Sequence, residues 1–267
     1  MELSIFLLFF GIGALVGLLA GFFGIGGGAV LNPFLLTFFQ WKNYNAEIYV
    51  HLAFGTSLFV SVFSSLFSLY RHQKNHNVLW RAVPFIALGG IIGAYFGSCV
   101  ATILSGAILK KIFAIVLAFF AYQMFRDRNA PAEVAPSRYK ITWLFPVGIG
   151  GGFLAALIGI GGGILYVPIM ILVLHYPVKK VAGTSSAIIT VAALSGAIGY
   201  IFHGWNHPLL PAGSWGFVYI IGVVPILLGA LLFSQIGAQL YHVLPEKIVR
   251  VLFASFLSVI FIRMMFF

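Results

Sequence analysis

Two glycine-rich pentapeptides contain the residues of this chain whose types and spacing could do chemistry. Both read GIGGG-x4-P, at 24–33 and at 159–168, a shift of 135 positions, and both lie inside long apolar runs. Each glycine costs about 1 kcal/mol relative to alanine in a helix interior, and a proline removes a backbone donor. A helix break is therefore predicted in each half. Its residues are Gly24, Gly26, Gly27, Gly28 and Pro33, then Gly159, Gly161, Gly162, Gly163 and Pro168.

The chemistry that such a break suits is anion binding. A half-helix that starts near Ala29 or Ile164 would point free backbone N–H groups and its positive end at the membrane midplane. The alternative interpretation is tight helix packing through small residues. Nucleotide binding is excluded, because no Lys-Ser or Lys-Thr follows either pentapeptide, and no βαβ pattern with an acid about 20 residues on surrounds them.

A second motif, Gly-Thr-Ser, also occurs in both halves. Its hydroxyl residues are Thr56 and Ser57, then Thr184 and Ser185. They are predicted either to donate to a tetrahedral oxyanion or to bond back to their own helix. Asn32 precedes the first proline where the second half has Val167, so any contact it makes is expected to be one-sided. His51 is interpreted as positive charge near the site or as a membrane boundary.

Composition identifies the class of protein that these motifs serve. The chain has 267 residues, of which 61% are apolar and 7% charged, and its mean hydropathy is +1.08. Soluble domains carry about 25% charged residues, so the sequence predicts a polytopic membrane protein. The net charge of +10 is assigned to topology and lipid headgroups, and no nucleic-acid partner is expected. The single cysteine, Cys99, excludes an intramolecular disulfide.

Acidic residues and histidines narrow the chemistry further. The five acids lie at the edges of apolar runs or between them, whereas cation sites and proton relays in membranes use buried carboxylates. An anion is thus favoured over a cation. Two histidine pairs have the i, i+4 spacing of metal ligands and are placed in loops, but no Cys, Asp or Glu accompanies them, so no metal site is expected. These pairs are His72/His76 and His203/His207.

The order of apolar runs predicts an all-α polytopic membrane protein with two homologous repeats. Each repeat has about four spans and one Gly/Pro-broken half-helix, and eleven residues of half-helix reach about 17 Å, half the hydrocarbon core. The basic residues favour inverted repeats over parallel ones. The repeats are 1–126 and 141–267, joined by a linker at 127–140. The runs are 3–20, 29–39, 47–70, 82–104 and 112–125, with Lys110-Lys111 between the last two, then 141–158, 164–174, a span with 183–185, 215–238 and 248–267.

GIGGG-x4-P early in each half, followed by a span with Gly-Thr-Ser, resembles the TauE/SafE family of membrane transporters. The resemblance covers essentially the whole chain. It implies an integral inner-membrane protein without an enzymatic cofactor. Family members are associated with export of sulfite, organosulfonates and other small sulfur-containing anions. The motif is specific for the family and not for the substrate.

Together these observations predict a secondary transporter of a small anion, sulfite or an organosulfonate, that works by alternating access. The two repeats would meet at a midplane site lined by both breaks and the Gly-Thr-Ser hydroxyls. Two alternatives stay open: an anion channel with the same site, and an intramembrane enzyme that uses the histidine pairs. The expected partners are the anion and the lipid bilayer of the inner or plasma membrane, and the composition is compatible with a homo-oligomer.

Overall fold

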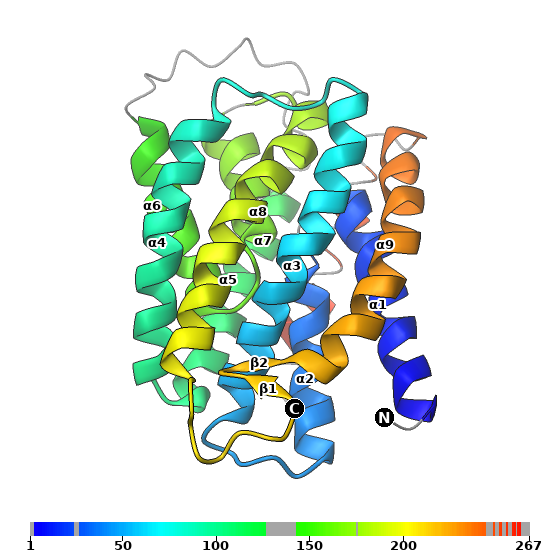
Figure 1. The fold of residues 1–267 in the computed structure, drawn as a ribbon. Coiled ribbons are helices and arrows are strands. Elements are labelled where there is room, and N and C mark those ends of the chain that lie inside the picture. Colours follow the sequence, from blue (N-terminus) through cyan, green and yellow to red (C-terminus); the bar gives the residue numbers. More distant parts are fainter. Residues whose placement is uncertain are drawn as a thin grey trace.

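A computed structural model of the chain describes residues 3–23, 27–126, 143–174, 176–243 and eight positions between 248 and 262. Gly24, Gly26 and the predicted linker lie outside these residues. The described part is helical apart from one short hairpin (Figure 1). Its elements are α1 (Leu3–Phe23), α2 (Gly28–Trp41), α3 (Tyr49–Lys74), α4 (Val83–Ile103), α5 (Gly106–Arg126), α6 (Leu144–Leu157), α7 (Gly163–Pro168), the π-helical turn η2 (Ile169–Val173), α8 (Val178–His203), β1 (Ser214–Trp215), β2 (Val218–Tyr219) and α9 (Ile220–Val243).

Five of the described helices are long and apolar enough to cross a membrane, namely α1, α3, α4, α8 and α9. About 20 apolar residues span a hydrocarbon core. Large apolar side chains lie exposed on these helices, for example Ile103 at 84% and Phe202 at 71%. Such a surface is stable against lipid and not against water. The chain is therefore an all-α polytopic integral membrane protein, as the sequence predicts.

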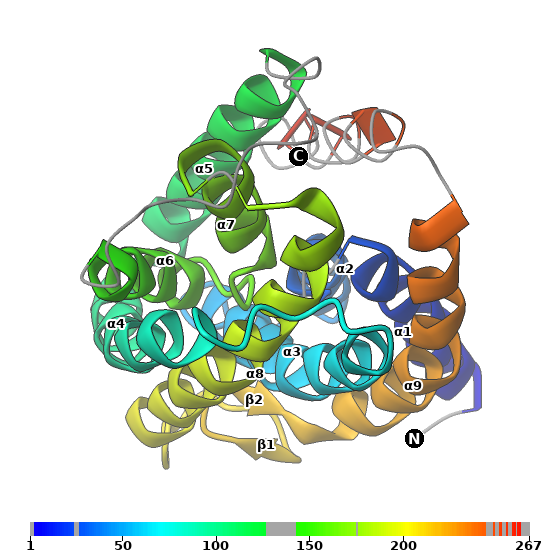
Figure 2. The ribbon, with the colours of Figure 1, turned by 90° about the horizontal axis from the view of Figure 1, so that it is seen from above.

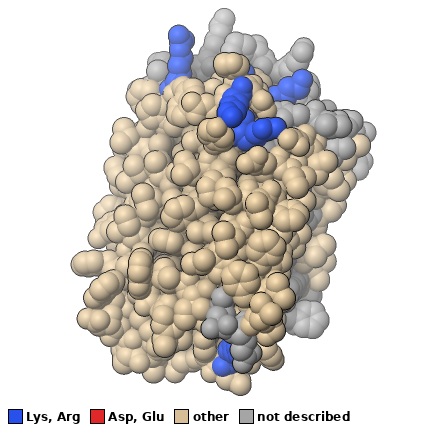
Figure 3. Space-filling model, turned by 45° about the vertical axis from the view of Figure 1, so that its right-hand side comes forward, with Lys and Arg blue, Asp and Glu red and all other residues tan. Residues whose placement is uncertain are grey.

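Charged side chains gather at the two ends of the long axis. On the face drawn in Figure 3, lysines and arginines lie at both ends and the belt between them carries none. One end holds the finish of α3 and α5 and the start of α4 and α8 (Figure 1). We call it the basic end, and its residues are Arg71, Lys74, Arg81, Arg126, Lys179 and Lys180. The opposite end has Lys42, Lys110 and Lys111.

Two antiparallel helices, α3 and α8, form the centre of the molecule (Figure 2). α1 and α9 pack together on one side of them, and α4 and α6 on the other. Glycines allow these close approaches. A β-carbon on Gly17 of α1 would overlap the backbone of Ala230, and one on Gly93 of α4 would overlap the carbonyl oxygen of Ile149.

The two short helices begin where the glycine motifs end. Gly27 precedes α2 with a φ of 83°, and Gly162 precedes α7 with a φ of 105°. Only glycine adopts such left-handed angles without strain. The predicted starts of both half-helices are thus confirmed. Pro33 lies inside α2, whereas Pro168 ends α7 and the helix continues as the π-helical turn η2. Each proline is the sixth residue of its helix and lacks the N–H of the regular pattern, so the proline alone does not account for the π-helical turn.

Three details of the sequence prediction are wrong. Lys110 and Lys111 lie inside α5, which begins at Gly106. The Lys110 ammonium donates to the Tyr49 hydroxyl and lies 4.8 Å from the centre of the Tyr49 ring. A lysine is tolerated inside the helix because its apolar stem can pack along it while the charged group bonds to Tyr49. α9, predicted as the span 215–238, starts at 220, because residues 214–219 form the hairpin. His72 and His203 belong to the last turns of α3 and α8 and not to loops.

Candidate functional site

The two helix breaks touch each other in the interior. The Asn32 side-chain Nδ2 donates to the carbonyl oxygens of Ile158 and Gly159, at 2.9 and 3.0 Å. A β-carbon on Gly28 would overlap the carbonyl oxygen of Ile160. Asn32, Ile158 and Ile160 are all 0% exposed. The Asn32 side chain of the first half therefore holds the break of the second half by hydrogen bonds. Val167, its counterpart in the second half, has no polar side chain that could form such bonds with the first half.

The middle of α3 completes this arrangement. Ser57 Oγ donates to the carbonyl oxygen of Gly28 at 3.3 Å. Ser61, the thirteenth of the 26 residues of α3, faces Gly161 so closely that a β-carbon there would lie 2.7 Å from the Ser61 Oγ. We call the place where these groups meet the crossing. It consists of Gly28, Asn32, Ser57, Ser61, Gly159 and Gly161.

The crossing holds polar groups that lack protein partners. Among the described residues, Asn32 Oδ1 and Ser61 Oγ are buried without a hydrogen bond. In the part of the chain that the structure describes, the backbone N–H groups of Gly161, Gly162 and Gly163 donate to no backbone carbonyl. An unsatisfied buried polar group costs about 1–3 kcal/mol. Buried polar groups are normally paired with protein, water or ligand. Ser61 Oγ and the three N–H groups can donate to a small polar ligand, whereas Asn32 Oδ1 can only accept and needs a donor such as water or a protonated ligand oxygen.

In the first Gly-Thr-Ser motif only Ser57 reaches the crossing, whereas Gly55 and Thr56 contact the opposite end of the molecule. Thr56 Oγ1 donates to the Leu52 carbonyl at 2.6 Å and accepts the Tyr219 N–H at 2.8 Å. Gly55 lets the Phe217 carbonyl approach, since a β-carbon would overlap it. A hydroxyl has one proton, and that of Thr56 is used by its own helix. The motif thus fastens the loop 204–219, the lower loop, to the start of α3.

The second motif repeats this arrangement at the basic end. Thr184 Oγ1 donates to the Lys180 carbonyl at 2.6 Å and accepts the Leu79 N–H at 3.0 Å. A β-carbon on Gly183 would overlap the Asn77 carbonyl oxygen. The loop 75–82, the upper loop, is thereby held on α8. Ser185 donates to Ala182 at 3.0 Å, within its own helix.

His51 also lies away from the crossing. It is 6% exposed, its Nε2 is 3.0 Å from the Leu104 carbonyl oxygen, and its Nδ1 is 3.1 Å from that of Glu47. Its ring centre lies 5.3 Å from that of Phe217. These contacts join the start of α3 to the end of α4 and to the lower loop, so His51 marks the boundary of the span.

The histidine pairs do not form a cluster with other ligands. Within the described residues, no group of three or more His, Cys, Asp or Glu side chains could hold a metal ion. His203 Nδ1 lies 2.8 Å from the Gly199 carbonyl oxygen, one turn earlier in α8.

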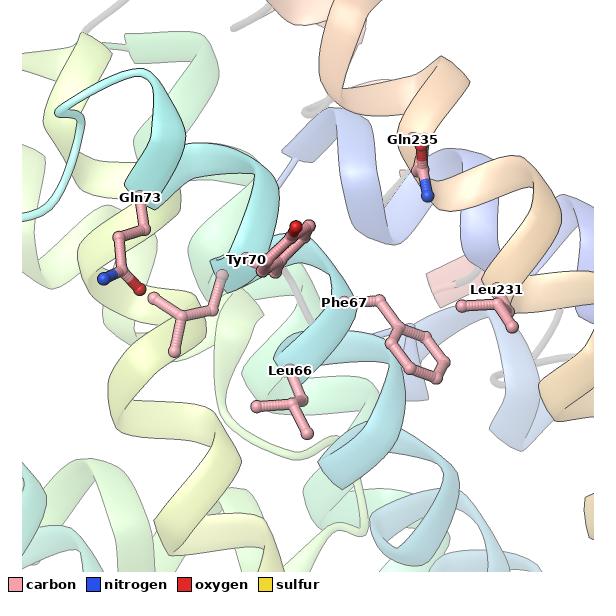
Figure 4. A pocket seen from close by; sticks show the side chains of 7 residues that line it. Leu66, Phe67, Tyr70, Gln73, Leu231 and Gln235 are labelled. Atoms are coloured by element: carbon pink, nitrogen blue, oxygen red, sulfur yellow. The ribbon is translucent and has the colours of Figure 1, made fainter.

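One cavity of about 390 Å³ opens between α3 and α9. Leu66 and Phe67 line it from α3 and Leu231 from α9, with Gln73 and Gln235 at its rim (Figure 4). None of these residues belongs to the crossing, and the lining is mainly apolar. The lining of the cavity offers an anion few donors, namely the side-chain amides of Gln73 and Gln235 and the Tyr70 hydroxyl.

Ser61 is the site residue that the repeat comparison missed. Its counterpart in the second half is Ile189, so a search for polar residues shared by both halves passes over it. A usable signal was present, because Ser57, Ser61, Ser65 and Ser68 recur at helical spacing in an apolar span.

Comparisons with known proteins place this chain in a family. The chain matches the family described as Sulfite exporter TauE/SafE over residues 9–264. It is 32% identical over 255 residues to a probable membrane transporter protein of Methanocaldococcus jannaschii, covering 93% of this chain and 91% of that one. It is 31% identical over 257 residues to a probable membrane transporter protein of Haemophilus influenzae, covering 95% of both chains. No solved structure matches it.

Proposed function

The chain belongs to the Sulfite exporter TauE/SafE family of probable membrane transporters, and from that premise we propose that it is a secondary transporter of a small anion. The substrate class we propose is sulfite or an organosulfonate. The site is the crossing, together with the glycine motif residues around it. The membrane is the cell's inner or plasma membrane.

The observation that carries this proposal is the contact between the two breaks through Asn32. Transporters bind substrate near the midplane, where interrupted helices of two repeats meet. The crossing lies beside Ser61, at the middle of α3. Free N–H groups and a hydroxyl there favour a ligand rich in acceptor oxygens, as the oxygens of sulfite and sulfonates are.

The two halves are proposed to be inverted repeats. The first helix of each half lies against the fourth helix of the other, since α1 packs on α9 and α6 packs on α4. α1 runs toward the basic end and α6 away from it (Figure 1). Both relations are expected from a two-fold axis in the membrane plane.

Alternating access would then use the two loops as gates. Thr184 holds the upper loop and Thr56 the lower loop, each by one N–H to hydroxyl bond at opposite ends of the α3–α8 pair. Release of one bond at a time would open the crossing to one side only. We propose that this conformation, in which both loops are fastened, is the occluded state of a transporter.

The test is counterflow in proteoliposomes. Vesicles loaded with unlabelled sulfite are expected to accumulate labelled sulfite through the wild-type protein, with saturable kinetics. Gly161→Leu is expected to lower this flux about tenfold or more, because a left-handed φ strains a branched residue by about 1–3 kcal/mol. Gly150→Leu is the matched control, since no atom lies within 4 Å of a β-carbon at that position of α6.

Each outcome decides between functions. Saturable counterflow that Gly161→Leu abolishes supports the transporter. Flux that follows voltage without saturation or counterflow would make the protein a channel. Normal counterflow by Gly161→Leu, at normal expression and membrane insertion, would remove the crossing from the substrate path.

A further inference from the structure

A row of buried hydroxyl groups leads from the crossing toward the basic end. They lie on facing sides of the two central helices, and we call them the hydroxyl seam. Its members are Ser61, Ser64, Ser65 and Ser68 of α3 with Ser186 and Thr190 of α8. Ser65 Oγ lies 3.0 Å from Thr190 Oγ1, and Ser186 Oγ donates to Ser68 Oγ at 3.1 Å. Each of these serines is 0–1% exposed.

The hydroxyl seam covers one half of the membrane only. Ser61 is at the midpoint of α3, and Ser68 lies seven residues further toward the basic end, which is about 10 Å along a helix. His72, buried at 0% exposure, follows one turn later, between Arg71 and Lys74 of the last turn. The row thus connects the crossing with the charged end of the molecule.

Close helix packing does not account for these hydroxyls. The motif shift of 128 positions relates Ser61, Ser64, Ser65 and Ser68 to residues of α8 that carry no hydroxyl, namely Ile189, Ala192, Ala193 and Gly196. These counterparts are buried as well, so apolar side chains pack this interface where nothing polar is needed. Polar side chains inside a membrane protein are costly unless they are paired or used.

One group of the hydroxyl seam lacks a partner and points at the crossing. Ser61 Oγ is fully buried, forms no hydrogen bond among the described residues and lies against Gly161. Ser65, Ser68, Ser186 and Thr190 bond to one another across the helix interface. Ser65, Ser186 and Thr190 also bond to carbonyl oxygens of their own helices, those of Val62, Ala182 and Ser186. On separation of the two helices, each hydroxyl would therefore have to rotate away from its own helix to donate its one proton to an oxyanion.

We propose that the hydroxyl seam lines the half of the substrate path between the crossing and the basic end. This rests on the proposed function. A small oxyanion would leave the crossing at Ser61 and pass along hydroxyl donors as α3 and α8 part at the basic end. The other half of the path would open along an apolar surface.

Cysteine labelling tests the path without requiring a known substrate. Cys99 is replaced by alanine, and Ser65→Cys, Ser68→Cys or Ala193→Cys is added. The probe is a membrane-impermeant methanethiosulfonate that carries a sulfonate group. Ser65→Cys and Ser68→Cys are expected to react from the basic end, whereas Ala193→Cys, the counterpart of Ser65, is expected not to react from there. Equal reaction of all three, or none from the basic end, would overturn the proposal.

Transport by alanine variants provides the second readout. Ser65→Ala and Ser68→Ala are expected to lower the maximal sulfite flux by about tenfold each, since hydrogen bonds to charged acceptors are the strong ones. Ser65→Thr, which keeps the hydroxyl, should restore it. Ser195→Ala is the control, because Ser195 bonds to Ile91 at 2.8 Å outside the hydroxyl seam. Wild-type flux in Ser65→Ala and Ser68→Ala would refute the proposal and leave the transporter standing, whereas no sulfite flux in the wild type would refute the proposed function.

Discussion

The two ends of the α3–α8 pair are closed in the same way, yet the halves between them differ. At the basic end Thr184 accepts the Leu79 N–H at 3.0 Å, and at the opposite end Thr56 accepts the Tyr219 N–H at 2.8 Å. The half near the basic end is lined by the hydroxyl seam, whereas in the other half Leu58 packs against Gly196. The duplicated motifs therefore hold the loops symmetrically, while the lining is one-sided.

The largest effect on stability is expected at Asn32, because the second half has Val167 at the equivalent position. Asn32→Leu removes both donors to the carbonyls of Ile158 and Gly159 and should cost about 2 kcal/mol or more, because buried carbonyls are left unsatisfied. Val167→Leu, at the equivalent position of the second half, should cost less than about 1.5 kcal/mol, since it only adds volume in an apolar contact. Thermal unfolding in detergent measures both.

Sulfite counterflow by the same two variants sharpens the contrast. Asn32→Leu should abolish it and Val167→Leu should retain it. Equal losses of stability and flux in the two variants would contradict a one-sided crossing.

The two threonines should have smaller, separable effects. Thr184→Val and Thr56→Val each remove one acceptor for a loop N–H, worth about 1 kcal/mol. Hydrogen exchange of the upper loop should quicken in Thr184→Val only, and that of the lower loop in Thr56→Val only. Faster exchange of both loops in either variant would show that the two ends are not independent.

Much of the fold could be predicted from the sequence, and five of the six residues of the crossing, all but Ser61, are among the residues that the sequence predicts for a site. The glycines and prolines predicted where α2 and α7 begin, because left-handed backbone and missing donors are local properties. The contact of Asn32 with the second break depends on how distant helices pack, which no local pattern contains. The threonines are predicted either to donate to an oxyanion or to bond back to their own helix; both bond back, to the carbonyls of Leu52 and Lys180, and the oxyanion role stays a prediction. Their bonds to loop N–H groups emerge only once the loops are placed. Ser61 is missed because its counterpart in the second half, Ile189, is not polar.

The smallest effect concerns Tyr44, which lies between α2 and α3, and its partner Tyr219 at the end of the lower loop. Burial and a hydrogen bond with Tyr219 raise the pKa of Tyr44 to about 12, above the usual value of about 10. Because the folded pKa is the higher one, this contribution to stability is full below pH about 10 and is lost as the pH rises toward about 12. Tyr44→Phe should flatten the alkaline part of the stability profile. An unchanged profile would mean that another group titrates there.

Binding of sulfite to the purified protein tests most directly whether the crossing is an anion site. The apparent melting temperature is measured against sulfite concentration, with chloride as the reference salt, for the wild type, Asn32→Leu and Gly150→Leu. A ligand at a hundred times its Kd stabilises the folded state by about 2.7 kcal/mol. We expect a saturable rise in melting temperature for the wild type and Gly150→Leu and none for Asn32→Leu. No rise in the wild type, or the same rise in all three proteins, would contradict an anion site at the crossing.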